Sequence, residues 1–490
     1  MNNTGLYSGS KLLNSGTRTG AASECRKTTA TRSRRETCEG WGPAIIKTSP
    51  CFSTAKGRYQ KTLLENGIRI VTENIPGQRS ISMGLLVEAG PRNEASGKNG
   101  LAHLAEHAMF CGTSSRSATQ IARLMDEAGG HMGAFTARDY TCYYATVLDD
   151  YLPYALDLLG DILLNSIFPP DRLEREKIAI LREIETACDM PAACSHDLLK
   201  ALAWPEHPLG RSIAGRPETV RSLSRDDVIY FVHQHYLPDR LVVAAAGNVD
   251  HEDFVAQVRD AFWRMLGQSR PGSTNLTAFR SGITLKHMPV SQYYFSMGIR
   301  APRYSDPNRY GMHILNNILG GGISSRLYRQ VREKHGIVYH IGSEYHAYRE
   351  DGMLVVEGCT APQNILQVLS MVVEELAKLI SGIEQIDAEE LWKTKMQLRG
   401  QHLISGESTN TRMNRIAAQE LYFNRQISDE EILTSIEAIS IKKLQSLAEN
   451  ALGKALSQTA IAVVGPQAPD RFKSLTVGEL LSEPQPREVI

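Results

Sequence analysis

Two histidines and a glutamate lie close together in the segment LAHLAEHAMFCGT, residues 101–113. They are His103, Glu106 and His107, in the order H-x-x-E-H. The leucines, alanines and methionine around them favour a helix, which would place both histidines on one face with Glu106 beside them. Two imidazoles at this spacing can bind one zinc ion, and the carboxylate can accept a proton from water. The segment therefore predicts an inverted H-E-x-x-H zinc motif, unless it is a surface helix with two solvated histidines.

A catalytic zinc ion usually has three protein ligands and one position open to water. The candidate for the third ligand is Glu183, on an expected helix from Asp171 to Cys188 that also carries Glu176. The two glutamates are seven positions apart, which places them two turns along one face of that helix. A lone glutamate on a helix is more often a solvated surface charge, so the spacing alone leaves both interpretations open.

The overall composition narrows the class of protein. The chain has 490 residues and a formal net charge of zero, which allows two or more domains and gives no indication of nucleic-acid binding. No apolar run has the length needed to span a bilayer. Eight scattered cysteines without a C-x-x-C pair exclude a disulfide framework and a cysteine zinc site, and they suit a reducing compartment.

The first part of the chain, residues 1–57, is expected to be a disordered leader. It is rich in serine, threonine, glycine and arginine and poor in large apolar side chains, so it has little to bury. It lacks the apolar core of a secretory signal, whereas its arginines and scarce acids resemble a mitochondrial transit peptide. A disordered leader, a misassigned start and a transit peptide all stay open.

The rest of the chain predicts two copies of one α+β unit. The first copy, in residues 58–266, has this expected order: strand 81–89, the motif helix, a helix from 118, strands 132–136 and 141–147, and helix 151–164. The second copy, in residues 283–466, repeats it: strand 293–300, helices 307–319 and 325–334, strands 338–345 and 352–359, and helix 362–380. Residues 267–282 are the expected linker, and residues 467–490 a tail. Such a repeated order indicates an internal duplication.

The second copy has no counterpart of the zinc motif. Where the first copy has HLAEH, the second has ILNNILG at residues 314–320. We therefore expect one zinc ion per chain, with the second copy serving as a lid or as a wall of the substrate site.

The zinc motif and its surroundings resemble the pitrilysin family of zinc metallopeptidases, peptidase family M16. Glu183 follows His107 by 76 positions in an E-x-x-x-x-x-x-E helix, as in that family. Other segments fit too: GTSSRSATQIARLMDEAGG after the motif, PLGRSIAGRPETV at 208–220, AAGNVD at 245–250, and GGGISSRLYRQVREKHGIVY at 320–339, which is similar to the family's inactive repeat. The resemblance covers about residues 59–466 and is nearest to subfamily M16B, with mitochondrial processing peptidase subunits and bacterial relatives. It implies two LuxS/MPP-like α+β domains, with mixed sheets packed by helices, that form a clamshell.

The resemblance also implies roles for individual residues of the motif-bearing half. Zinc would be bound by His103, His107 and Glu183, with Glu106 as the general base. Glu176 would be a carboxylate that orients a ligand histidine.

Two further residues of the site are implied in the second half. Arg332 and Tyr339 match the family's arginine and tyrosine that reach the substrate backbone and the scissile carbonyl, where a tyrosine hydroxyl can stabilise the oxyanion. The alternative is a surface arginine and a core tyrosine.

One departure from the family concerns the strand that pairs with the substrate. Family members usually carry Asn-Ala there, whereas this chain has Gly133 and Ala134, followed by Phe135. Glycine loses the contact of the asparagine side chain but leaves the backbone edge available for an added peptide strand. We therefore expect the substrate to lie along these three residues.

The implied activity is that of a zinc-dependent endopeptidase that cleaves short or unfolded peptides, including leader peptides, inside a chamber between the two halves. The alternative is a subunit that needs a partner chain and acts mainly as a noncatalytic binding component. The expected partners are a peptide substrate and a second M16 chain, in a homodimer or a heterodimer. We expect a cytoplasmic protein of bacterial type, or a mitochondrial matrix protein if residues 1–57 are a transit peptide.

Overall fold

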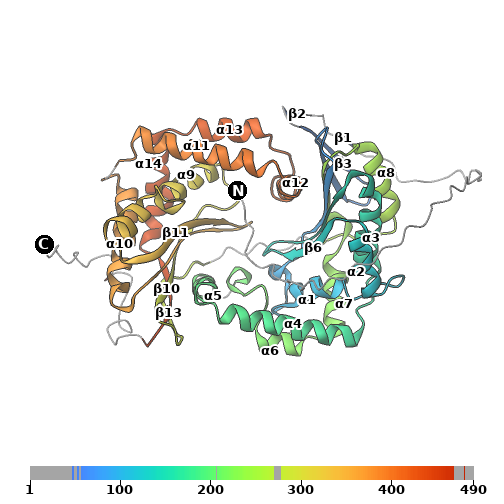
Figure 1. The fold of residues 1–490 in the computed structure, drawn as a ribbon, viewed down its shortest axis with the longest axis horizontal. Helices are drawn as coiled ribbons and strands as arrows, with labels where there is room; N and C mark the ends of the chain where they lie inside the picture. Colours follow the sequence, from blue (N-terminus) through green and yellow to red (C-terminus); the bar gives the residue numbers. More distant parts are fainter. Residues whose placement is uncertain are drawn as a thin grey trace, which may run out of the picture.

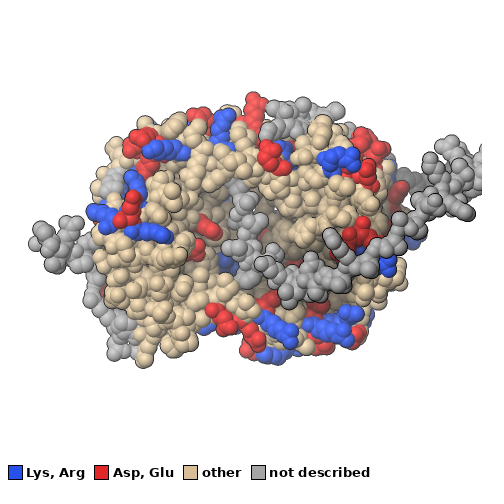
Figure 2. Space-filling model, viewed as in Figure 1, with Lys and Arg blue, Asp and Glu red and all other residues tan. Residues whose placement is uncertain are grey.

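The computed structural model of the chain describes residues 47–48, 52–54, 57–205, 207–269, 278–383, 385–467 and 479. It consists of two halves, each built on a β-sheet that is packed by helices (Figure 1). The surface is hollowed where the two halves face each other (Figure 2). In the described residues, none of the helices combines the length and the apolar character required to span a membrane.

The first half contains the larger sheet. Its longer strands are β3 (Gly57–Leu63), β4 (Arg69–Asn74), β5 (Ser80–Val87), β6 (His131–Thr136), β7 (Thr141–Leu148) and β8 (Leu241–Gly247). Its helices are α1 (Leu101–Met109), α2 (Ala118–Glu127), α3 (Leu152–Asn165), α4 (Pro170–Cys188), α5 (Pro191–Ala203), α6 (Pro217–Ser222), α7 (Arg225–His235) and α8 (His251–Phe262). Strand β8 is buried along its whole length, as expected for a central strand that is covered on both faces.

The second half contains a five-stranded sheet. Its strands are β9 (Gly282–His287), β10 (Tyr293–Ala301), β11 (Val338–Ala347), β12 (Gly352–Thr360) and β13 (Ala460–Gly465). Its helices are α9 (Arg309–Gly320), the π-helical η5 (Tyr328–Lys334), α10 (Ile365–Ser381), α11 (Ala388–Ser405), α12 (Thr409–Phe423), α13 (Asp429–Glu437), α14 (Ile441–Leu447), the π-helical η7 (Ala448–Gly453) and α15 (Lys454–Leu456). Short 3₁₀ helices occur in both halves. The first half has η1 (Pro91–Asn93), η2 (Asp149–Tyr151), η3 (Pro208–Gly210) and η4 (Pro238–Arg240), and the second half has η6 (Pro362–Asn364).

The two sheets share one topology, which confirms the predicted pair of α+β units. Five strands of the first sheet, in the order β4-β8-β5-β7-β6, match the whole second sheet, whose order is β9-β13-β10-β12-β11, and β3 lies beyond β4 in the first sheet. In both of these five-strand orders the first pair is parallel and the remaining pairs are antiparallel. Strand β6 ends the path of the first sheet, and β11 ends that of the second.

One helix from each half packs on the sheet of the other half. Helix α5, from the first half of the chain, packs on β10 and β13, and α12, from the second half, packs on β4, β5 and β8. Met413, Ile416 and Ala417 of α12 join the buried cluster on the first sheet, while Leu199 and Ala203 of α5 join the cluster on the second. Residues 267–282 are the proposed linker, but the two halves that they join pack against each other through α5 and α12.

The expected leader needs a correction at its end. Two short strands within residues 1–57, β1 (Lys47–Thr48) and β2 (Phe52–Thr54), pair antiparallel with β3. Regular structure thus starts within residues 1–57, because β3 offers these segments a row of backbone hydrogen-bonding groups. Residues 1–46 lie outside the described residues, as do 270–277 of the proposed linker and all of the proposed tail beyond 467 except Glu479.

Candidate metal centre

Helix α1 carries the H-x-x-E-H motif, and its start is capped by a side chain from the preceding loop. It begins after Gly100, whose φ of 95° lies in the left-handed region that glycine tolerates. Glu94, which is 6% exposed, accepts hydrogen bonds from the backbone N–H groups of Gly100 at 3.1 Å and Ala102 at 2.9 Å. Burial raises the pKa of Glu94 to about 7, although these hydrogen bonds act to lower it. The loop thereby satisfies N–H groups that the start of a helix leaves unpaired.

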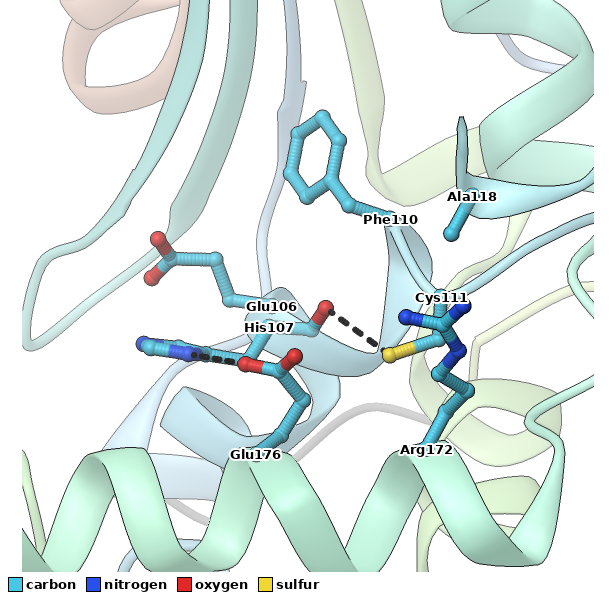
Figure 3. Close-up of a pocket in the computed structure, with 7 residues that line it drawn as sticks. All are labelled: Glu106, His107, Phe110, Cys111, Ala118, Arg172 and Glu176. Carbon is cyan, nitrogen blue, oxygen red and sulfur yellow. Dashed lines mark hydrogen bonds and ion pairs between the residues drawn. The ribbon is translucent and has the colours of Figure 1, made fainter. Parts of the chain in front are cut away.

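Helix α4 brings two glutamates to the motif. Leu173, Ile180 and Ile184 form part of its buried face, and α4 packs against α1. This packing directs Glu176 and Glu183 towards the histidines of α1, as Figure 3 shows for Glu176.

The two histidines and Glu183 converge on one point. The rings of His103 and His107 lie with centroids 4.7 Å apart, at 80° to each other. The Glu183 carboxylate lies 3.8 Å from His103 Nε2 and 3.9 Å from His107 Nε2. One ligand atom from each residue lies within 4.8 Å of the others. Ligand atoms around a tetrahedral zinc ion are roughly 3.4 Å apart, so small side-chain movements would let all three share one ion.

The surroundings shift the pKa values of the two histidines in opposite directions. Burial, with the neighbouring His107, lowers the pKa of His103 to about 3, so its ring is neutral and keeps a free lone pair. Burial alone would lower the pKa of His107, but its hydrogen bond with Glu176 and the nearby carboxylates raise it overall. The Nδ1 atom of His107 lies 3.1 Å from Glu176 Oε2. This contact leaves Nε2 facing Glu183, the arrangement found around metal-binding histidines.

Glu106 is held between helix α1 and strand β6. Its Oε2 atom accepts a hydrogen bond from Thr136 Oγ1 at 2.5 Å. Burial raises the pKa of Glu106, while the Thr136 hydrogen bond and the charge of His107 act in the opposite direction. A carboxylate in this position, beside a metal-binding group of side chains, can act as a general base and acid, and a raised pKa favours that role.

A pocket of about 230 Å³ opens beside these groups (Figure 3). Its lining combines site residues with apolar and basic ones: Glu106, His107, Phe110, Cys111, Ala118, Arg172 and Glu176. The pocket is large enough for one side chain of a bound molecule, next to the carboxylate that would move the proton.

The predicted substrate strand is β6, at the end of the first sheet. Gly133, Ala134 and Phe135 pair with β7 on one side, and no described strand pairs with the other side. A Cβ atom at Gly133 would lie 3.2 Å from the hydroxyl of Tyr144, closer than most such contacts. Glycine therefore suits this position because the Tyr144 ring occupies the space of a larger side chain.

Arg332 and Tyr339 contact each other in the second half. Arg332 Nη1 donates a hydrogen bond to the carbonyl oxygen of Tyr339, and its guanidinium lies 5.4 Å from the centre of the Tyr339 ring. Tyr339 is 75% exposed, because the pairing of β11 with β12 shifts between Val338 and His340 and a bulge redirects side chains. It is not a core tyrosine. Among the described contacts, neither residue has a hydrogen bond or ion pair with α1 or α4.

The structure thus unites five of the predicted site residues, His103, Glu106, His107, Glu176 and Glu183, and leaves Arg332 and Tyr339 apart from them. It adds two residues that the sequence reasoning missed. Glu94 caps the motif helix, and Thr136 bonds to Glu106.

Known proteins resemble this chain in sequence and in fold. The family description "Insulinase (Peptidase family M16)" matches residues 69–216, and "Peptidase M16 inactive domain" matches residues 222–398. An uncharacterized zinc protease of Bacillus subtilis is 34% identical over 402 residues, which are 82% of this chain and 97% of the relative. An uncharacterized zinc protease of Streptomyces coelicolor is 35% identical over 446 residues, which are 89% of this chain and 96% of the relative.

Solved structures share the fold. A protease from Helicobacter pylori aligns with a TM-score of 0.78 at 20% identity, over 84% of this chain and 100% of the other. A Pseudomonas fluorescens protein described as a peptidase M16 inactive domain aligns with a TM-score of 0.77 at 19% identity, over 84% of this chain and 98% of the other. The sequence matches, which cover almost the whole length of the relatives, show that this chain belongs to peptidase family M16.

Proposed function

We propose that the protein is a zinc-dependent endopeptidase that cleaves short or unfolded peptides. The observation that carries this proposal is the convergence of His103, His107 and Glu183 beside the carboxylate of Glu106. The names of the bacterial relatives, zinc proteases, support the same chemistry. The second copy of the unit has ILNNILG in place of the motif, so we propose one zinc ion per chain.

In this proposal each residue of the centre has one task. His103, His107 and Glu183 hold the ion, and Glu176 fixes the tautomer of His107 by accepting its Nδ1–H. When bound, zinc would polarise the scissile carbonyl and lower the pKa of a water molecule. Glu106 accepts the proton from the attacking water and then delivers it to the nitrogen of the leaving amine. The peptide bond breaks between the carbonyl carbon and that nitrogen, giving a carboxylate and an amine.

The substrate would lie extended along the open edge of β6, at Gly133, Ala134 and Phe135. An added peptide strand can form backbone hydrogen bonds with such an edge. The hollow between the halves (Figure 2) supports a chamber that accepts an extended chain and excludes a folded domain. Arg332 and Tyr339 would reach the substrate when the second half closes over it, with the Tyr339 hydroxyl donating to the oxyanion.

Narrower forms of this proposal specify a partner chain and a dedicated substrate. A homodimer, or a heterodimer with another M16 chain, would be consistent with a peptidase that needs a second subunit for activity. Removal of leader peptides would be one use of the same centre. The bacterial origin of the relatives supports a cytoplasmic protein of bacterial type.

The proposal predicts internal cleavage of unstructured peptides. A fluorescence-quenched peptide of about twenty residues should be cut at internal bonds, whereas the same sequence held within a folded domain should be resistant. A zinc chelator should abolish the cleavage, and added zinc should restore it, because the ion activates both water and carbonyl. Mass spectrometry of the products checks the positions. Removal of single terminal residues, or cleavage that continues after zinc is stripped, would contradict an endopeptidase of this kind. Cleavage only after a second M16 chain is added would identify a subunit that needs its partner.

A further inference from the structure

The carboxylate of Glu106 has one side-chain hydrogen bond in the described part of the chain, and the donor is Thr136. The Oγ1 to Oε2 distance of 2.5 Å lies in the range of charge-assisted bonds between a hydroxyl and a carboxylate. The two residues come from different elements, because Glu106 lies on α1 and Thr136 is the last residue of β6. This contact therefore joins the proposed general base to the proposed substrate strand.

The framework around Thr136 fixes the position of its hydroxyl. Thr136 pairs with Thr141 of β7, and the turn after it is closed by a hydrogen bond from Ala137 N–H to the carbonyl of Tyr140 at 2.8 Å. Its branched Cβ also restricts rotation about χ1. The hydroxyl is thus presented to Glu106 by rigid backbone rather than by a flexible side chain.

The turn beyond Thr136 is anchored in turn by a buried aspartate. Asp139 is 2% exposed and accepts hydrogen bonds from Arg92 Nη1 at 3.1 Å, from the Tyr422 hydroxyl at 2.7 Å and from the backbone N–H of Arg349 at 3.2 Å. Tyr422 and Arg349 belong to the second half of the chain. The end of β6 is therefore held by contacts from both halves.

We infer that Thr136 is a positioning residue for the proton transfer by Glu106, an inference that rests on the proposed peptidase function. By donating to Oε2, its hydroxyl fixes the rotation of the carboxylate and leaves Oε1 as the atom that accepts the proton of the attacking water. The Thr136 proton stays on Oγ1 throughout. The proton taken by Oε1 passes to the leaving nitrogen, so Glu106 returns to its initial state.

Three variants of the full chain test this inference. Thr136→Val removes the hydroxyl and keeps the branched shape, and Thr136→Ser keeps the hydroxyl. Thr146→Val is the matched control, because Thr146 lies on the neighbouring strand and its hydroxyl bonds to Ser82 at 2.8 Å. The readouts are kcat and KM on an unstructured peptide, together with the zinc content of each protein.

Thr136→Val should lower kcat about tenfold to a hundredfold, the range expected for a lost hydrogen bond to a charged group, with KM and zinc content unchanged. Thr136→Ser should recover most of the rate, and Thr146→Val should match the wild type. In a Glu106→Gln background, Thr136→Val should cause no further loss, because the two residues act as one unit.

Two results would overturn the role of Thr136 while leaving the peptidase function intact. One is an unchanged kcat in Thr136→Val when Glu106→Gln is inactive. The other is a Thr136→Ser variant as slow as Thr136→Val, which would indicate packing rather than hydrogen bonding. Full activity in Glu106→Gln would instead refute the proposed function, and the inference with it.

Discussion

Glu106→Gln should nearly abolish peptide cleavage while the protein keeps its zinc. Glutamine has nearly the same shape and can still accept a hydrogen bond from Thr136, but it cannot take up a proton from water. General acid–base catalysis contributes about 10²- to 10⁴-fold to a rate, so kcat should fall by about a thousandfold. Zinc content should stay at the wild-type value, because Glu106 is not among the three converging ligand residues.

The matched control is Glu185→Gln, the same substitution at an exposed position of helix α4. It should change neither kcat nor zinc content. Both variants are compared on one unstructured peptide, with zinc measured in the same preparations. Comparable activity in the two variants would mean that Glu106 is not the base.

The second large effect is expected on the free energy of unfolding. It concerns helix α12, which belongs to the second half of the chain but packs on the first sheet. Arg412 of α12 is 5% exposed in its side chain and pairs with Glu73 of β4, which is 0% exposed. Arg415 offers Glu73 only a more distant contact, at 3.9 Å. Arg412→Met would leave the Glu73 carboxylate buried without its main partner, which costs about 3–5 kcal/mol in such sites. The expected result is a clearly lower midpoint of urea unfolding.

Two comparisons separate this cost from a general loss of packing. Arg425→Met removes an exposed ion pair with Glu431 just beyond α12, and exposed pairs contribute about 0–1 kcal/mol. Combining Arg412→Met with Glu73→Met should recover much of the lost stability, because no buried charge is then left unpaired. Equal effects of Arg412→Met and Arg425→Met would show that the buried pair does not hold α12 on the sheet.

The elements that carry the metal centre were predictable because their signals are local. The apolar spacing around His103 predicts the helix that the structure shows as α1, and the helix expected from Asp171 to Cys188, which carries both glutamates, is α4. The repeated order of strands and helices also predicts two similar sheets, since each element has its own periodicity.

The exchange of α5 and α12 between the halves was not predictable in the same way. The buried side chains of α12, such as Met413 and Ile416, show a helix with an apolar face. An apolar face does not specify which sheet it covers, since the hydrophobic effect has no direction. The division at residues 267–282 followed composition, which carries no information on this packing.

Glu94 and Thr136 were missed for a related reason. A helix cap is sought in the residue just before the helix, but that residue is Gly100, and the cap comes from Glu94 on the preceding loop. Thr136 lies 30 positions from Glu106, so only the fold brings the two together. Glycine at position 133 is likewise explained by the Tyr144 ring across the strand pair.

The most direct test of the account is anomalous X-ray scattering at the zinc absorption edge, measured on crystals of the purified chain grown with zinc. One strong peak per chain is expected, about 2.0–2.2 Å from the Nε2 atoms of His103 and His107 and from a carboxylate oxygen of Glu183. No second peak of this kind should lie at helix α9. A zinc ion bound elsewhere, or a preparation that cleaves peptides without a peak at these three residues, would contradict it.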